Sequence, residues 1–323
     1  MRVLVLGGDG FLGSHVVDRL VVSGHDVTVF DRFPCGGPSR VGGHGQRVRL
    51  ARGELGDSPE LREALVGQEV VYHFISATTP GSSWDDPMAE IVGNIRPTLE
   101  FLRLAAVAKV RRIAFASSGG TIYGRQDGLL TEDSPARPVS PYGIGKLAIE
   151  GFIRHCCEAS GFDCDIYRIA NAYGPRQPAR GGQGVIANWI ARILEGRPLE
   201  AFGAGAVRDY VFVEDIAELM SFSARARAGS ELFNIGTGRG TSLDGLIEIF
   251  RDVIPARFEV VRRPGRAFDV PSIVLSGERL LKEFPGFCYT ALEEGIRRTW
   301  AEASAGWKTD SPPLGHPRSE DVR

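Results

Sequence analysis

Hydrophobic residues in the first half of the chain fall into short, nearly unbroken runs, separated by segments with helical spacing. Such runs are typical of strands that are buried on both faces of a parallel sheet. The runs that predict strands are 3–7, 26–31, 48–55, 70–76, 111–118 and 164–170. Helices are expected between them, from about Phe11, near 59–66, over 88–108 and over 142–159. This alternation predicts an α/β fold with a doubly wound parallel sheet, which binds ligands at the carboxyl ends of its strands.

The pattern changes after Asn171. The next segment, AYGPRQPARGGQG (172–184), is rich in Gly, Pro and Arg, as is typical of an ordered loop or a lid. Helical patterns return near 185–195, 242–253 and 290–302. Because composition and pattern shift together, we predict a first domain over 1–171, a smaller C-terminal α/β domain over 172–303 that mainly binds substrate, and a polar, disordered tail over 304–323.

The composition is that of a globular protein without a marked charge. Hydrophobic residues make up 43% of the 323 residues, and the formal net charge of −2 offers no basic surface for nucleic acid. No apolar run reaches the roughly 18–20 residues of a membrane span, and MRVLVLGG lacks the parts of a secretion signal. The five cysteines are odd in number and form no CxxC pair, and the six histidines have no metal-binding spacing. We expect a cytoplasmic protein with no metal site and no nucleic-acid or membrane partner.

A glycine-rich turn, GGDGFLG, joins the first strand to the first helix. Gly7, Gly10 and Gly13 have GxxGxxG spacing, which permits a tight turn and lets a pyrophosphate approach the backbone. The N–H groups at the start of the helix, at Phe11 and Leu12, would then bind that pyrophosphate. This arrangement predicts a Rossmann-like dinucleotide-binding unit. A turn that only packs a strand against a helix is the alternative, because a lone glycine triplet is a weak signal.

An acidic residue at the end of the second strand supports the dinucleotide site. Asp31 lies 18 residues after Gly13, in VTVFDR. A carboxylate there accepts hydrogen bonds from an adenosine ribose and repels a 2′-phosphate, which favours NAD over NADP. Arg32, which follows, could instead stabilise a 2′-phosphate, and a solvated turn aspartate is a further alternative.

The segment SPYGIGK places Tyr142 and Lys146 four residues apart, on one face of the expected helix. A free tyrosine has a pKa of about 10, too high for a base at neutral pH, and a nearby ammonium group lowers that pKa. Such a pair can take a proton from a sugar hydroxyl while hydride leaves the same carbon. A surface Tyr–Lys pair is the alternative. Gly143 and Gly145 weaken the helix, which predicts close approach of another backbone or of a ligand.

Together, GGDGFLG, Asp31, SSGGTIYG and YGIGK resemble the extended short-chain dehydrogenase/reductase family, in its NAD-dependent epimerase/dehydratase branch. The segments RIANAYGPRQ, RDYVFVEDIAE, FNIGTG and RRPG match the same branch, so the resemblance runs from residue 1 to about residue 300. It implies NAD as cofactor and a nucleotide sugar as substrate, bound between the two domains. It also implies a homodimer formed by the helices over 88–108 and 142–159.

The resemblance assigns roles to individual residues. Tyr142 is the implied base, and Lys146 is its partner and also holds the nicotinamide ribose. Further cofactor contacts are implied for Glu54, Leu55, Ile75, Ser76, Ala77 and Ser117, although the family often has an aspartate where Glu54 and Leu55 stand. Substrate contacts are implied for Thr78, Asn171, Val185, Ile186, Arg192, Phe202, Arg208, Arg263 and Asp269.

Asn171, Arg208 and Arg263 match the family residues that contact the sugar diphosphate, for which the planar fork of arginine is well suited. Arg266 stands where many relatives have an aspartate, so we expect the ribose contact to pass to Asp269.

The three residues Gly119, Gly120 and Thr121 bear on the reaction. Dehydratases of the branch resemble one another in having an Asp–Glu pair at the second and third of these positions, and decarboxylating members keep a glutamate at the third. Gly120 and Thr121 carry no carboxylate, which favours epimerisation, because that reaction needs no further acid or base. Many epimerases have Ser or Thr in place of Gly119. We therefore expect Thr121, Ser118 or an ordered water to contact the C4 oxygen of the sugar beside the tyrosine.

The sequence thus predicts an NAD-dependent 4-epimerase of a UDP-hexose such as UDP-glucose, or of a UDP-hexuronate such as UDP-glucuronate. An arginine near C6, among Arg125, Arg180 and Arg192, would bind a carboxylate in two places and favour the hexuronate. The alternatives are a nucleotide-sugar reductase, dehydratase or decarboxylating synthase of the same fold, and a non-catalytic NAD-binding regulator.

Overall fold

The structure is a computed structural model that describes residues 1–33, 39–179, 184–203, 205–265 and 270–310. Three of the residues named above, Arg180, Arg266 and Asp269, lie outside the described residues, as does the tail from 311 onward. No helix among the described residues is long and apolar enough to cross a membrane.

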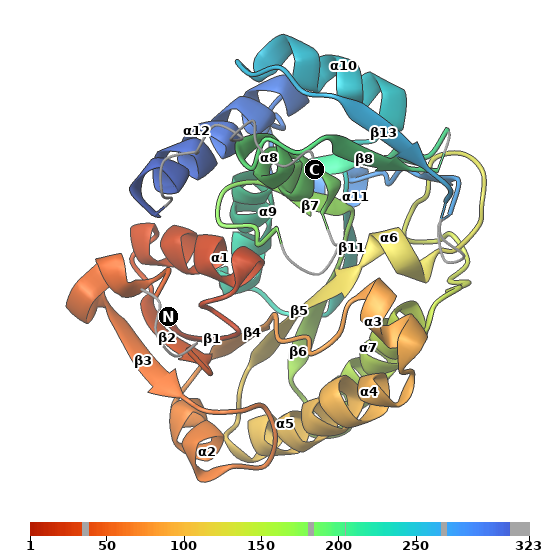
Figure 1. Ribbon diagram of the computed structural model, residues 1–323. Helices are drawn as coiled ribbons and strands as arrows, with labels where there is room; N and C mark the ends of the chain where they lie inside the picture. Colours follow the sequence, from red (N-terminus) through yellow and green to blue (C-terminus); the bar gives the residue numbers. More distant parts are fainter. Residues whose placement is uncertain (34–38, 180–183, 204, 266–269, 311–323) are drawn as a thin grey trace.

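A parallel sheet forms the centre of the larger layer (Figure 1). In the described part of the chain it has seven strands, in the order β11-β6-β5-β4-β1-β2-β3. Their bounds are β1 Arg2–Leu6, β2 Asp26–Asp31, β3 Val48–Arg52, β4 Val70–His73, β5 Arg112–Ser118, β6 Asp163–Ile169 and β11 Glu231–Ile235. β1 pairs in parallel with both β2 and β4, so the winding direction reverses between β1 and β4. A ligand site is expected at the carboxyl ends beside this reversal.

Helices cover both faces of this sheet, as the continuous apolar strands predict (Figure 1). In β1, Val3 and Val5 pack under one face and Leu4 and Leu6 under the other, because successive side chains alternate across a strand. The first face lies against α1 (Phe11–Val22) and α9 (Val213–Met220). The second lies against α2 (Pro59–Leu65), α5 (Arg96–Val107) and α7 (Pro141–Ser160). The doubly wound α/β fold is therefore confirmed.

The C-terminal elements form a smaller layer beyond the carboxyl ends of the sheet (Figure 1). Its core packs Trp189 of α8 against Phe250 of α10, with ring centroids 5.2 Å apart. Its helices are α8 Val185–Leu194, α10 Leu243–Val253 and α12 Leu292–Asp310. Its strands are β7 Asn171–Tyr173, β8 Leu199–Phe202, β9 Val207–Arg208, β10 Tyr210–Phe212, β12 Thr241–Ser242, β13 Val260–Arg263 and β14 Ser272–Ile273. Short elements complete the fold: η1 Gly42–Arg47, α3 Pro80–Asp85, α4 Met88–Glu90, η2 Ile91–Ile95, α6 Gly119–Ile122, η3 Ser221–Ala224 and α11 Glu278–Leu281.

Several expectations about elements need correction. The segment 88–108 is not one regular helix, because the π-helical turn η2 separates α4 from α5. The last helix, α12, continues to Asp310, so residues 304–310 are helical and not a disordered tail. β11 lies between elements of the smaller layer in sequence but pairs with β6 at the edge of the large sheet. The chain after residue 171 therefore contributes to both layers.

Candidate functional site

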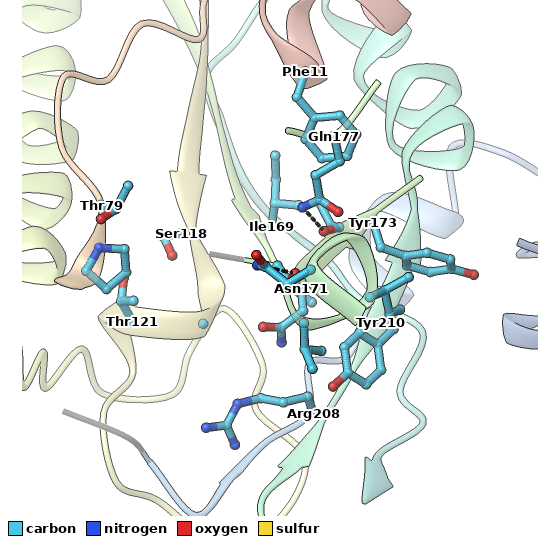
Figure 2. A pocket seen from close by; sticks show the side chains of 18 of the residues that line it. Phe11, Thr79, Ser118, Thr121, Ile169, Asn171, Tyr173, Gln177, Arg208 and Tyr210 are labelled. Carbon is cyan, nitrogen blue, oxygen red and sulfur yellow. Dashed lines mark hydrogen bonds between the residues drawn. The ribbon is translucent and has the colours of Figure 1, made fainter. Parts of the chain in front are cut away.

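A cavity of about 1020 Å³ lies between the carboxyl ends of the sheet and the smaller layer. Figure 2 shows Thr79, Ser118 and Thr121 on one side of it, and Asn171, Arg208 and Tyr210 on the other. The predicted site residues that line it are Gly7, Gly10, Phe11, Leu12, Gly13, Ser76, Thr78, Ser117, Ser118, Thr121, Tyr142, Lys146, Asn171, Val185, Ile186, Arg192, Phe202 and Arg208. Residues far apart in sequence thus meet in one pocket, at the upper end of the usual volume range for small-molecule sites.

The glycine turn leaves a backbone cradle at the start of α1. Gly7 has a φ of +78°, which a side chain would strain, and its N–H donates to the Phe30 carbonyl at 2.8 Å. A Cβ on Gly13 would lie 2.2 Å from the Gly7 carbonyl oxygen, so only glycine fits there. No side chain caps the N-terminus of α1. The free N–H groups at this helix end form a site that fits a pyrophosphate.

Asp31 ends β2 directly beside this cradle. Its carboxylate accepts hydrogen bonds from the backbone N–H of Asp9 at 3.0 Å and of Arg32 at 2.7 Å. These bonds hold the carboxylate where the second strand meets the glycine turn. Asp31 and Arg32 are not part of the cavity lining; the Arg32 side chain is exposed.

The other predicted cofactor residues lie at the ends of β3 and β4, also outside the cavity lining. Glu54 is exposed, whereas Leu55 packs onto the core beneath α2 and α5. Ile75 lies against the glycine turn, 3.1 Å from the place of a Cβ on Gly7. Ala77 is exposed, and its N–H donates to Asn94 at 2.7 Å.

Tyr142 and Lys146 lie one turn apart at the start of α7. The Ser140 hydroxyl caps this helix by accepting from the N–H of Gly143, and Pro141 occupies the first turn. The Lys146 ammonium lies 5.6 Å from the centre of the Tyr142 ring and donates to the Ala116 carbonyl at 3.1 Å. The predicted helix is therefore confirmed, and both side chains face the cavity.

The pKa of Tyr142 differs from the sequence expectation. Burial, with a smaller contribution from the negative charge of Glu90, raises this pKa to about 12, and a hydrogen bond with Ser76 acts in the opposite direction. The net shift of the tyrosine pKa is therefore upward and not downward as expected, because loss of solvation outweighs any effect of the ammonium. Burial also lowers the pKa of Lys146 to about 8, against the raising effect of Glu90 and Glu150.

Two buried polar residues near this pair escaped the sequence analysis. Glu90 and Asn94, on α4 and η2, hydrogen-bond to each other and to the Thr78 hydroxyl. Thr78 lines the cavity, and its hydroxyl is bound to these residues; the implied contact of Thr78 with substrate stays a prediction. The sequence contains a signal for them, because Glu90 and Asn94 are polar residues four positions apart in the segment 88–108, whose apolar residues have helical spacing.

The SSGGTIYG segment ends β5 and begins α6 at the cavity wall. A Cβ on Gly119 would lie 2.2 Å from Leu275, whereas a Cβ on Gly120 would meet nothing within 4 Å. The Thr121 hydroxyl oxygen is buried and has no hydrogen-bond partner among the described residues. Ser118 also lines the cavity (Figure 2). In contrast, the Ser117 hydroxyl donates to Glu150 at 2.6 Å.

The predicted arginines differ in their access to the cavity. Arg208 lines it and donates to the Val207 carbonyl at 2.9 Å (Figure 2). Arg192 also lines it, but Glu200 binds its guanidinium at 3.1 Å. Arg263 pairs with the same Glu200 at 3.1 Å and does not line the cavity. Arg125 is exposed and lies outside the lining. Asn171, which lines the cavity, donates to the Asp209 carbonyl at 3.2 Å.

Comparisons with known proteins agree with this geometry. Residues 3–236 match the profile of the NAD dependent epimerase/dehydratase family. A UDP-glucose 4-epimerase of Mycolicibacterium smegmatis is 33% identical over 305 residues, which cover 93% of this chain and 97% of the relative.

Two solved structures show the same likeness across nearly the whole chain. The UDP-glucose 4-epimerase of Thermotoga maritima, crystallised with UDP-glucose, has a TM-score of 0.87 and 31% identity, covering 95% of this chain and 99% of that one. The Thermus thermophilus UDP-glucose 4-epimerase, in complex with NAD, has a TM-score of 0.86 and 30% identity, covering 96% and 100%.

The family match spans the glycine turn, Asp31, Tyr142 and Lys146. The glycine turn, Tyr142 and Lys146 line the cavity, and Asp31 lies beside the glycine turn. The chain is therefore a nucleotide-sugar epimerase or dehydratase with NAD as its cofactor, and it belongs to the NAD dependent epimerase/dehydratase family.

Proposed function

We propose that this protein is a UDP-hexose 4-epimerase. The observation that carries the proposal is the cavity wall beside Tyr142 and Lys146, where Gly120 and Thr121 carry no carboxylate. Removal of water from the sugar needs an additional acid or base near C5 and C6, whereas epimerisation at C4 needs only a base for the C4 hydroxyl. A Cβ on Gly120 would enter open space, so an acid could fit there, but this chain has none.

The residues beside the glycine turn fit the cofactor. The N-terminus of α1 would hold the pyrophosphate, the Asp31 carboxylate would accept from the adenosine ribose, and Lys146 would hold the nicotinamide ribose. When bound, NAD would supply the acceptor and donor for the C4 hydride, and its oxidised ring would add positive charge near Tyr142.

Tyr142 and Lys146 perform the proton transfer. The phenolate oxygen of Tyr142 takes the proton of the C4 hydroxyl and gives it back after the sugar has turned. Because the surroundings raise the pKa of Tyr142 to about 12, the phenolate needs positive charge close by. The Lys146 ammonium supplies part of it and is protonated at neutral pH, since its pKa is about 8. Thr121, with its unpartnered hydroxyl, would hold the C4 oxygen beside the tyrosine.

The far side of the cavity would bind the nucleotide diphosphate. Asn171 and Arg208 line this side, opposite Ser118 and Thr121 (Figure 2). A diphosphate bound there would keep the nucleotide sugar in the cavity while the keto sugar ring rotates and exchanges one of its faces for the other. The cavity volume of about 1020 Å³ leaves space for this rotation.

The contacts of the arginines favour a neutral hexose over a hexuronate. Of the three arginines considered for a C6 carboxylate, Arg125 is exposed outside the cavity lining, and Arg180 is not among the described residues. Arg192 lines the cavity, but its guanidinium is already bound to Glu200, which Arg263 shares. A carboxylate would have to compete with Glu200 for this guanidinium, so UDP-glucose is the better substrate.

Incubation of the purified protein with UDP- and dTDP-sugars, followed by chromatography, tests the proposal. We expect UDP-glucose and UDP-galactose to interconvert, with no product of water loss or decarboxylation, and Tyr142→Phe to reduce turnover at least about 10²-fold. Turnover of UDP-glucuronate above that of UDP-glucose would contradict the preference for a neutral hexose. Formation of a 4-keto-6-deoxy sugar, or no conversion of any UDP-sugar, would contradict the epimerase.

A homodimer and a cytoplasmic location remain predictions. Exposed apolar side chains support the dimer, because they gather on the two helical segments that the sequence analysis named. On α4 and η2 these are Met88, Ile91 and Val92, with 58%, 49% and 58% of their surface exposed. On α7 they are Ile144 and Phe152, at 56% and 39%. A clustered apolar surface of this kind is typical of a protein interface.

A further inference from the structure

Glu90 is a buried carboxylate next to the proposed catalytic pair, at 4% exposure. It ends α4, immediately before the π-helical turn η2, and such turns occur frequently at functional sites. No lysine, arginine or histidine forms an ion pair with Glu90 within the described ranges. A buried carboxylate without a direct cationic partner is costly, so its presence here calls for a role.

Hydrogen bonds hold this carboxylate against the loop that follows β4. One of its oxygens accepts from the Thr78 hydroxyl, and the other accepts from the Asn94 side-chain amide at 2.9 Å. Both oxygens act as acceptors, as in an ionised carboxylate. Asn94 also donates to the Thr78 hydroxyl at 2.8 Å and accepts from the Ala77 N–H at 2.7 Å. The loop that carries Ser76, whose hydroxyl donates to the Thr78 carbonyl at 3.2 Å, is thereby tied to Glu90.

The same carboxylate lies against α7 at Gly145, which stands between Tyr142 and Lys146 in the sequence. A Cβ on Gly145 would lie 2.6 Å from the Glu90 carboxylate oxygen Oε2, so the helix has room for the carboxylate only because residue 145 is glycine. Gly145 directly precedes Lys146 and follows Tyr142 by three residues. Glu90 thus joins the loop after β4 to the turn of α7 that carries the pair.

We infer that Glu90 is a positioning residue for Tyr142 and Lys146, which fixes the loop after β4 against α7 and supplies the negative charge that balances the pair. The inference rests on the proposed function, and nothing in the family match or in the relatives' names assigns this residue a role.

The other titratable groups around Tyr142 and Lys146 are either ion-paired or neutral. Glu150, on α7, binds Arg168 at 2.8 Å and Arg154 at 3.1 Å. His73, on β4, is neutral, because burial and the charge of Lys146 lower its pKa to about 3. The charge of Glu90, in contrast, raises the pKa of both Tyr142 and Lys146.

The pH dependence of kcat/KM for UDP-glucose in the variant Glu90→Gln tests whether the negative charge of Glu90 acts on Tyr142 and Lys146. Glutamine has the same shape but no charge, so both pKa values should fall. The phenolate then forms at lower pH and the ammonium is lost at lower pH, and both limbs of the profile move to lower pH by roughly half a unit or more. Glu63→Gln, which removes an exposed carboxylate on α2, should leave the profile in place. A Glu90→Gln profile that coincides with wild type would overturn the charge role.

Hydrogen–deuterium exchange at residues 76–80 tests the positioning without any assay of activity. Glu90→Ala should speed exchange there and lower kcat about 10- to 100-fold, because the loop and α7 are no longer joined. Gly145→Ala should disturb the same contact from the helix side, and the double variant should be no slower than Glu90→Ala alone. Unchanged exchange and kcat in both single variants would overturn the inference. If the wild type converts no UDP-sugar, the proposed function fails, while the exchange experiment still decides whether Glu90 holds the loop.

Discussion

At the scale of single residues, Asp31 determines the expected choice between the two dinucleotides. Its carboxylate is held at the end of β2 by the backbone N–H groups of Asp9 and Arg32. Asp31→Ala should weaken binding of NAD at least about tenfold, as expected for a lost hydrogen bond to a charged group. Binding of NADP should weaken less or improve, because the repulsion of its phosphate is removed. Titration with NAD and with NADP measures the ratio of the two dissociation constants. Asp26→Ala, at the exposed start of the same strand, is the control, and equal affinity of the wild type for NAD and NADP would refute the assignment.

The two hydroxyls on the cavity wall give a second test at this scale. Thr121 has a buried hydroxyl without a partner among the described residues, which makes it the better candidate for the C4 oxygen. Thr121→Ala should lower kcat roughly 10²-fold, whereas Thr121→Ser keeps the hydroxyl and should retain most of the activity. Ser118→Ala should have the smaller effect. If neither alanine variant slows epimerisation tenfold, Tyr142 contacts the C4 oxygen without their help.

At the scale of elements, the two glycines of α6 have different reasons to be glycine. A side chain on Gly119 would run into the side chain of Leu275, which is fully buried in the core, whereas Gly120 faces open space. Gly119→Ala should therefore reduce the free energy of unfolding by about 1–3 kcal/mol, as overpacking does. Gly120→Ala should change it by less than about 0.5 kcal/mol. Urea denaturation measures the free energy of unfolding of both variants. The double variant Gly119→Ala, Leu275→Ala should recover part of the stability that Gly119→Ala loses. Equal effects of the two single variants would contradict this packing.

The glycines of α7 show how far a local pattern predicts contacts. Their presence in a helix predicts close approach, and the structure confirms it at both positions. A Cβ on Gly143 would lie 2.6 Å from the Thr121 carbonyl oxygen, and a Cβ on Gly145 would lie 2.6 Å from Glu90. The sequence indicates that something approaches the helix. The identity of each neighbour depends on the path of the chain through α4 and α6.

At the scale of the whole molecule, the exposed apolar residues on η2 and α7 predict a dimer. Val92→Glu and Phe152→Glu each place a charge on this surface, at 58% and 39% exposure, and should convert the dimer to a monomer because a buried unpaired charge is costly. Val22→Glu, at 76% exposure on α1, should leave the dimer intact. Size-exclusion chromatography with light scattering measures the mass. A monomeric wild type, or a dimer that persists in both variants, would show that this surface is not the interface.

Much of the fold and part of the candidate site follow from the sequence alone. Unbroken apolar runs predict the strands of the parallel sheet, because a strand covered on both faces is apolar at every position. The glycine turn and the four-residue spacing of Tyr142 and Lys146 predict local geometry that the structure confirms. These features depend on neighbours in sequence, so periodicity and backbone preference are sufficient to predict them.

The tertiary structure decided what depends on distant segments. It placed β11 in the large sheet, paired Arg192 with Glu200, and brought Leu275 against Gly119. It raised the pKa of Tyr142, because burial depends on every element around the side chain and not on the lysine four residues away. It also gathered Thr78, Glu90 and Gly145 around the pair. Solvation and long-range contacts are properties of the folded chain, and no pattern of neighbouring residues contains them.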